Sequence, residues 1–328
     1  MKATLLKRLF SALEKNSNRD VISVCNRIVE EERQLGHTTL AKELEQSLKR
    51  LNQLAETNPD VRKEPSFRSL PSSRREAAPL VQVLDRTILR HHMVLADEVE
   101  ERFQRIEKEY AARTRLAKYG LRASRRILLY GPPGCGKSLG AERLAWCTGL
   151  PLQKVRFDTL ISSYFGETAS NLQRVFAAAE QHPVALFLDE CDTIAQERGR
   201  RQDVGEVSRV VNMLLQLLED FKGEGMVIAA TNLYDSLDKA LFRRFDEALQ
   251  IPLPGMPEIV RLLEVTLSAL SVDADVDFAK FARSLDGYSC NDVEKIAQSA
   301  AKRAVMESRR SVMFLDLEIA AGEIRNHV

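Results

Sequence analysis

Apolar and polar positions divide the chain into three regions with different patterns. In residues 1–55, apolar side chains recur three or four positions apart in three separate stripes, which predicts three short amphipathic helices. Residues 56–79 hold four prolines among serines and charged side chains, so we expect a flexible linker there. From residue 80 onward, short apolar runs typical of buried strands alternate with helical patterns, which predicts an α/β fold with a parallel sheet covered by helices.

The bulk composition disfavours several classes of protein. With 48 basic and 47 acidic side chains, the chain carries a formal net charge of +1, which disfavours nucleic acid as a partner. Its five cysteines form no CxxC pair, which argues against a zinc site or a disulfide framework and favours a reducing compartment. No apolar run reaches the roughly 18 residues of a membrane span. We therefore expect a cytoplasmic protein without a membrane span.

The most specific motif follows the apolar run at 127–130. It is GPPGCGKS, residues 131–138, which fits the pattern GxxxxGK[ST] and precedes a helical stretch. In such a loop the backbone N–H groups turn toward phosphate oxygens, Lys137 neutralises the β- and γ-phosphates, and the Ser138 hydroxyl can ligate Mg²⁺. The motif therefore predicts a nucleoside triphosphate and Mg²⁺ as ligands.

Polar side chains follow two further apolar runs. Asp189, at the end of the first, is placed to hold Mg²⁺ through water together with Ser138, and the adjacent Glu190 can polarise a water for attack on the γ-phosphate. Asn232, after the second run, can hydrogen-bond the γ-phosphate or that water. The residues expected to bind the nucleotide are Gly131, Pro132, Pro133, Gly134, Cys135, Gly136, Lys137, Ser138, Leu139 and Asp189.

These motifs together resemble the AAA+ ATPases, and within them the AAA subgroup, over roughly residues 85–325. In this interpretation GPPGCGKS is the Walker A loop, LFLDE is Walker B and Asn232 is sensor 1. The resemblance implies ATP hydrolysis with Mg²⁺ and a P-loop NTPase sheet with helices on both faces. It implies a large α/β ATPase subdomain at 80–254 and a helical lid at 255–328.

Two arginines match the arginine fingers of that family. Arg243 and Arg244 lie in LDKALFRRFDEALQIPLPG, which is shorter than the common form with Pro-Gly between the arginines, so we assign the role to both. Such an arginine assists hydrolysis only in the pocket of a neighbouring subunit, and the resemblance implies a ring of six copies. A solvated charge pair is the alternative interpretation.

The stretch LDGYSCNDVEKIAQSAAKRAV resembles the sensor 2 region of the lid. Cys290 and Asn291 replace the small residues usual there, and the resemblance implies that their neighbourhood contacts adenine and ribose. Ser289 and Asp292 also fit a helix-capping box, a structural explanation for part of the pattern.

An aromatic pair, Tyr164 and Phe165, precedes Gly166 in a polar stretch between the two Walker motifs. The resemblance implies that these three residues form pore loop 1, which faces the axis of the ring, with the glycine supplying a bend. Large, rigid aromatic side chains suit a non-specific grip on an extended polypeptide. Packing of the aromatics against the sheet is the alternative.

The leading hypothesis is an ATP-driven protein remodeller that works as a homo-hexamer. Residues 1–55 would recruit a protein substrate, which the ring unfolds or threads. The layout resembles stand-alone AAA proteins of the microtubule-severing and membrane-remodelling types, and compact bacterial AAA ATPases, some paired with a separate protease such as a subtilisin-like one. Two alternatives stay open: a nucleic-acid motor or loader, which the near-zero net charge and aromatic pair disfavour, and a slow nucleotide-gated assembly scaffold.

Overall fold

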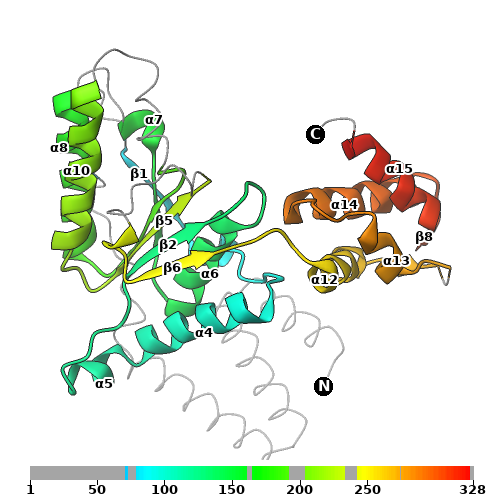
Figure 1. The fold of residues 1–328 in the computed structure, drawn as a ribbon, viewed down its shortest axis with the longest axis horizontal. Coiled ribbons are helices and arrows are strands. Elements are labelled where there is room, and N and C mark those ends of the chain that lie inside the picture. Colours follow the sequence, from blue (N-terminus) through cyan, green and yellow to red (C-terminus); the bar gives the residue numbers. More distant parts are fainter. Residues whose placement is uncertain are drawn as a thin grey trace, which may run out of the picture. The chain divides into compact units, whose positions relative to one another are not determined.

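The apolar runs of the sequence form a six-stranded sheet in the computed structural model of the chain (Figure 1). All neighbouring strands are parallel except β1 and β3, which are antiparallel. This mostly parallel sheet with its helices confirms the predicted α/β class. In their order across the sheet, the strands are β1 (Val81–Leu84), β3 (Leu152–Val155), β4 (Ala185–Leu188), β5 (Met226–Thr231), β2 (Arg126–Tyr130) and β6 (Glu247–Gln250).

The chain divides into two units, residues 1–68 and residues 69–328. The predicted recruitment domain, most of the predicted linker and Tyr164 lie outside the described residues. None of the described helices is long and apolar enough to cross a membrane. The structure describes residues 71–72, 79–160, 165–191, 204–232, 242–273 and 275–325, without the side chains of 165–166 and 204–211.

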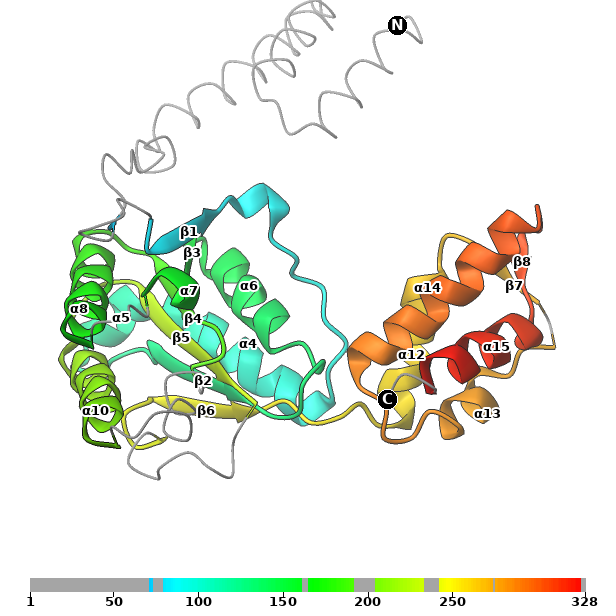
Figure 2. The same cartoon turned by 90° about the horizontal axis from the view of Figure 1, so that it is seen from above.

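Helices cover both faces of the sheet (Figures 1 and 2). Helices α4 and α6 pack on one face, where Phe103, Ile106 and Leu144 are fully buried, and α8 and α10 lie together on the other face. This core holds the carboxyl ends of the parallel strands in fixed positions. The helices of this part are η2, a 3-10 turn (Arg86–Ile88), α4 (Asp97–Ala111), α5 (Arg113–Ala117), α6 (Lys137–Thr148), α7 (Phe157–Leu160), α8 (Phe165–Gln181) and α10 (Val204–Asp220).

The antiparallel strand β1 lies at one edge of this otherwise parallel sheet. In the sequence it directly follows the proline-rich segment. Leu80 N donates to Pro71 O at 2.8 Å, and Ser72 and Pro79 form an isolated antiparallel bridge. Arg174 of α8 donates to Ser72 O at 2.9 Å. The last residues of the predicted linker are therefore bonded to the edge of the sheet.

Residues 256–325 form a helical subdomain with its own core, which we call the lid. Ile259, Leu263, Ile296, Ala300 and Leu317 are fully buried within it. Two short parallel strands join its loops. Its elements are α12 (Met256–Leu267), β7 (Ser271–Val272), α13 (Phe278–Arg283), α14 (Cys290–Met306), β8 (Ser311–Val312) and α15 (Phe314–Arg325).

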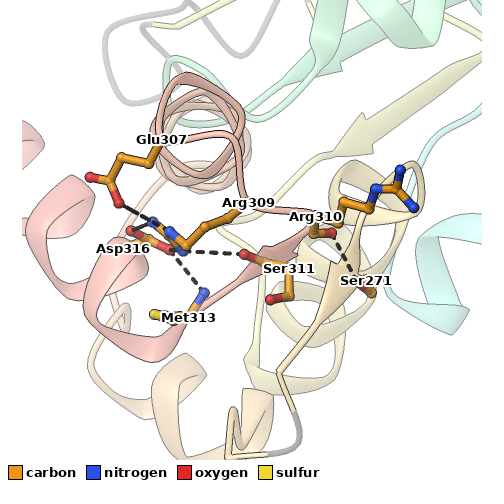
Figure 3. Close-up of polar contacts among 7 residues, drawn as sticks. All are labelled: Ser271, Glu307, Arg309, Arg310, Ser311, Met313 and Asp316. Atoms are coloured by element: carbon orange, nitrogen blue, oxygen red, sulfur yellow. Dashed lines mark hydrogen bonds and ion pairs between the residues drawn. The ribbon is translucent and has the colours of Figure 1, made fainter.

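An ion-pair cluster fixes the turn from α14 to α15 (Figure 3). Arg309 donates to both carboxylate oxygens of Asp316 at 2.8 Å and to Glu307 at 2.8 Å. It also donates to Ser311 O at 3.2 Å. Asp316 in turn accepts from Met313 N at 2.9 Å, at the start of α15. The cluster therefore joins the end of one lid helix to the first turn of the next.

Candidate nucleotide-binding site

The loop between β2 and α6 is shaped by glycines with positive φ. Gly131 (φ 142°) and Gly134 (φ 75°) adopt backbone conformations that residues with side chains rarely take. A Cβ at Gly131 would lie 2.1 Å from Ile251 O, and one at Gly134 would lie 2.5 Å from Ser289 Oγ. The loop therefore passes close to the end of β6 and to the lid, with no room for side chains at these two positions.

Lys137 begins α6 and is buried, with 8% of its surface exposed. Its ammonium donates to Gly131 O at 2.9 Å and to Pro132 O at 2.6 Å, so the side chain folds back over the preceding loop. The N-terminus of α6 adds partial positive charge and backbone N–H groups at the same place. This arrangement suits the binding of phosphate groups.

Asp189 follows β4 and meets two donors on one oxygen. Its Oδ2 accepts from Ser138 Oγ at 3.1 Å and from Lys154 Nζ at 2.7 Å. Hydroxyl and carboxylate oxygens are ligands that Mg²⁺ prefers in proteins. Ser138 and Asp189 therefore fit the predicted metal site in the nature of their donor atoms and in their proximity.

Glu190 has a φ of 53°, in the left-handed region that is uncommon for a residue with a side chain. The next residue, Cys191, donates its N–H to Ala230 O at 3.0 Å, so the turn after β4 is bonded to the end of β5. Glu190 is exposed and lines the same cavity as Lys137 and Asp189. A strained backbone held in place by neighbours is frequent at functional positions.

Asn232 follows the fully buried Thr231 at the end of β5. It is half-buried and also lines this cavity. Because β4 and β5 are adjacent and parallel, their carboxyl ends lie side by side. This register brings Asn232 to the edge of the sheet that carries Asp189 and Glu190.

The cavity has a volume of about 560 Å³ and is bounded by the loop, the strand ends and two lid helices. Sequence reasoning missed several of its lining residues because they come from segments with no local motif. One such segment lies between η2 and α4, and another lies on α12. Glu294 of α14 falls within the stretch that resembles sensor 2, but only the neighbourhood of Cys290 and Asn291 was expected near the nucleotide. The missed residues are Arg90, His92, Met93, Val94, Arg261, Leu262, Val265, Thr266 and Glu294.

The lid meets the loop through backbone and capping groups. Asn291 N donates to Gly134 O at 3.0 Å. Ser289 and Asp292 form the capping box at the start of α14, with the Ser289 Oγ accepting from Asp292 N at 3.2 Å. The first turn of α14 is therefore hydrogen-bonded directly to the glycine-rich loop between β2 and α6.

Two cysteines line the cavity, one from the loop and one from the lid. Burial raises the pKa of the Cys135 thiol. Burial, with the neighbouring Cys135 as a smaller cause, raises the pKa of the Cys290 thiol to about 12. Both thiols therefore stay protonated near neutral pH and act as small, weakly polar lining groups.

Arg243 and Arg244 do not line this cavity. Arg243 is exposed, and Arg244 forms an ion pair with Glu219 at the end of α10. Both precede β6, the outer strand of the sheet. The structure thus brings eight of the ten predicted nucleotide-binding residues around one cavity, together with Glu190 and Asn232. Gly131, Pro132 and the two arginines do not line it.

Phe165 and Gly166 are the first two residues of α8, so a helix stands where we expected a loop bend at the glycine. Glu167, also in the first turn of this helix, is favourable beside the positive end of the helix dipole. The Phe165 side chain lies outside the described part of the structure, as does Tyr164.

Comparisons with known proteins agree on one family. The profile of the ATPase family associated with various cellular activities (AAA) matches residues 127–253. An uncharacterized AAA family ATPase of Sinorhizobium fredii is 34% identical over 316 residues, which cover 96% of this chain and 93% of the relative.

Two archaeal relatives match about 70% of this chain. Proteasome-activating nucleotidase 2 of Haloferax volcanii is 32% identical over 70% of this chain, and the proteasome-activating nucleotidase of Archaeoglobus fulgidus is 33% identical over 69%. The matches cover 58% and 59% of those two relatives, so this chain spans less than two thirds of their length.

Proposed function

Because the chain belongs to the AAA family and is an ATPase, we propose that it forms a ring that uses ATP hydrolysis to remodel a protein substrate. The observation that supports this most is the convergence of Lys137, Ser138, Asp189, Glu190 and Asn232 on one cavity beneath a helical lid. Each of these side chains has a distinct role in phosphoryl transfer to water.

In the proposed mechanism, the loop binds the phosphates through its backbone N–H groups. Lys137, already folded over the loop, exchanges its bonds to Gly131 O and Pro132 O for bonds to the β- and γ-phosphate oxygens. Ser138 and Asp189 would hold Mg²⁺, which supplies charge neutralisation on the phosphates when it is bound. These residues thereby fix the γ-phosphate at the carboxyl edge of the sheet.

Glu190 is the proposed general base. It is exposed to the cavity one residue after Asp189, so it can accept a proton from the water that attacks the γ-phosphate. Asn232, at the end of the neighbouring strand, orients that water or the γ-phosphate through its amide. The two side chains follow adjacent parallel strands and line the same cavity.

The proposed ring rests on the position of Arg243 and Arg244, because the arginines that line the cavity of the described subunit are two others, Arg90 and Arg261. Positive charge on the outer side of the γ-phosphate would come from Arg243 and Arg244 of a neighbouring copy, since neither lines the cavity of its own chain. Arginines supplied from a partner raise hydrolysis by about 10³–10⁵-fold in related enzymes. A head-to-tail contact of this kind closes into a ring, for which we propose six copies.

The substrate class rests on the relatives and on the aromatic pair. Two relatives are named proteasome-activating nucleotidases. In the sequence, Tyr164 comes immediately before α8, and Phe165 and Gly166 are its first two residues, between β2 and β4. We propose that Tyr164 and Phe165 grip an extended polypeptide at the ring axis. Residues 1–55 would then recruit that polypeptide.

The test measures ATP hydrolysis by the full chain alone, with a chemically unfolded protein, and with single- or double-stranded DNA. We expect unfolded protein to stimulate hydrolysis and DNA to leave it unchanged. Tyr164→Ala should keep the basal rate and lose the stimulation, whereas Tyr164→Phe should retain it. Stimulation by DNA alone would favour a nucleic-acid motor, and a slow rate that nothing stimulates would favour an assembly scaffold.

A further inference from the structure

Lys154 lies at the nucleotide site although no motif of the sequence includes it. It is on β3, beside Phe187 of β4 in the parallel register. Its Nζ lies 2.7 Å from Asp189 Oδ2, the same oxygen that accepts from Ser138 Oγ at 3.1 Å. A lysine from a third element of the fold therefore shares one carboxylate oxygen with the serine hydroxyl.

The surroundings of Lys154 hold its charge near Asp189. The ammonium lies 5.7 Å from the centre of the Phe187 ring, within the range of a cation–π contact. The side chain of Lys154 is 39% exposed and that of Asp189 is 18% exposed. The pair is thus partly shielded from water. Opposite charges attract each other more strongly in such a place than on an open surface.

A magnesium ion held by Ser138 and Asp189 would bring two further positive charges to the same carboxylate. The ammonium and the metal ion repel each other, and both need the negative charge of Asp189. We propose that Lys154 competes with Mg²⁺ for Asp189 and so sets the Mg²⁺ concentration at which the subunit retains its nucleotide. This inference rests on the proposed metal role of Ser138 and Asp189.

Two other roles for Lys154 give different results. If the lysine only fastens β3 to the end of β4, its removal lowers the stability of the fold and leaves the Mg²⁺ dependence unchanged. If the lysine contacts the γ-phosphate, its removal weakens the binding of ATP more than that of ADP. If Lys154 competes with Mg²⁺, as we propose, its removal lowers the Mg²⁺ concentration needed to retain nucleotide, and does so equally for ATP and ADP.

The experiment measures the release rates of fluorescent ADP and non-hydrolysable ATP analogues from the full chain while Mg²⁺ is titrated. Lys154→Met removes the charge and keeps an apolar stem over Phe187, and Lys154→Arg keeps the charge. Lys108→Met, at an exposed position of α4, is the matched control. We expect Lys154→Met to lower the Mg²⁺ midpoint by about three- to fivefold, the size that a partly exposed ion pair supports. The arginine variant and the control should stay at the parent midpoint.

A Lys154→Met midpoint equal to that of Lys108→Met would overturn the inference, as would a loss of affinity confined to the ATP analogue. In an Asp189→Asn background, Lys154→Met should no longer shift the midpoint, because the shared carboxylate is gone. Should the methionine variant not fold, Lys154→Gln repeats the test with a side chain that stays hydrated. If the parent protein retains nucleotide equally well without Mg²⁺, both this inference and the proposed metal site are wrong. If the parent depends on Mg²⁺ but Lys154→Met does not shift the midpoint, the inference about Lys154 is wrong and the proposed metal site stands.

Discussion

Among individual residues, Lys137 and Glu190 bring opposite charges to one cavity through different backbone features. The lysine is held by the carbonyls of its own loop, at 2.9 and 2.6 Å. The glutamate sits in a left-handed turn that a hydrogen bond from Cys191 N to Ala230 O fastens to the next strand. In the proposed mechanism, the positive charge binds phosphate and the negative charge accepts the proton of the attacking water.

At this scale, the general-base role predicts the behaviour of Glu190→Gln. The amide has the shape of the carboxylate but accepts no proton from water, so ATP binding should persist while hydrolysis falls by about 10²–10⁴-fold. Steady-state phosphate release and equilibrium binding of an ATP analogue measure the two properties. Glu318→Gln, on the exposed side of α15, is the control. Hydrolysis by Glu190→Gln at the parent rate would contradict the assignment.

The part of the site that is local in sequence could be predicted, and the rest could not. The loop at 131–138 and the Asp189-Glu190 pair each directly follow a buried strand, so spacing alone indicates their chemistry. Arg90 and residues 92–94 reach the cavity only through tertiary packing, and no periodicity marks them. Lys154 has the pattern of an ordinary polar residue in a strand, because its partner Asp189 is 35 positions away.

Between elements, a buried arginine joins the two helices on one face of the sheet. Arg143 of α6 donates to Glu100 of α4 at 2.5 and 2.7 Å and to Glu107 at 2.9 Å. Its guanidinium also lies 5.3 Å from the centre of the Phe103 ring. Hydrogen bonds from Arg143 hold the pKa of Glu100 below its ordinary value. One cation between two carboxylates therefore joins α4 to α6 beside their apolar packing.

Arg143→Met tests this contact. The methionine preserves much of the apolar packing but leaves Glu100 and Glu107 without their counter-charge, so we expect the free energy of unfolding to fall by about 2 kcal/mol. Urea unfolding at pH 7 measures the change. Arg115→Met removes an exposed arginine from α5 and should have little effect. Equal stability of the two variants would show that the ion pairs do not hold the helices together.

The lid contains a second charged contact, between Arg309 and Asp316 (Figure 3). Hydrogen bonds from the Arg309 guanidinium hold the pKa of Asp316 below its ordinary value. Ionisation of Asp316 therefore increases the free energy of unfolding. This contribution is complete above the ordinary aspartate pKa of about 4, and it is lost as the pH falls through the lowered pKa of the folded state.

Asp316→Asn should therefore lower the melting temperature by several degrees at pH 7, and the difference from the parent should shrink as the pH falls below about 4. Thermal unfolding at a series of pH values measures this difference. Asp286→Asn, at an exposed position after α13, is the control and should match the parent at each pH. A difference that stays constant from pH 7 to the acid end would show that the ionised form of Asp316 does not stabilise the lid.

For the whole molecule, the class of the fold could be predicted because strands buried on both faces leave continuous apolar runs in the sequence. Runs at 127–130, 184–188 and 226–230 correspond to β2, β4 and β5 within one residue at each end. Strand β1 could not be predicted, because its four residues follow a proline-rich segment and their antiparallel pairing depends on β3, about 70 positions later.

Also at this scale, the described subunit has a nucleotide cavity that its own Arg243 and Arg244 do not line. In the proposed ring, each copy provides the base for its own pocket and the arginines for the pocket of its neighbour. Two kinds of inactive subunit should therefore complement each other. One carries Arg243→Ala with Arg244→Ala, and the other carries Glu190→Gln.

The most direct measurement is the ATPase rate of an equal mixture of these two variants after subunits exchange. We expect each variant alone to be nearly inactive and the mixture to recover activity, because about a quarter of its interfaces pair an intact Glu190 with intact arginines. Each variant mixed with parent protein under the same conditions checks that subunits exchange. A mixture no more active than the average of its two components, in preparations that do exchange, would contradict the shared-pocket account.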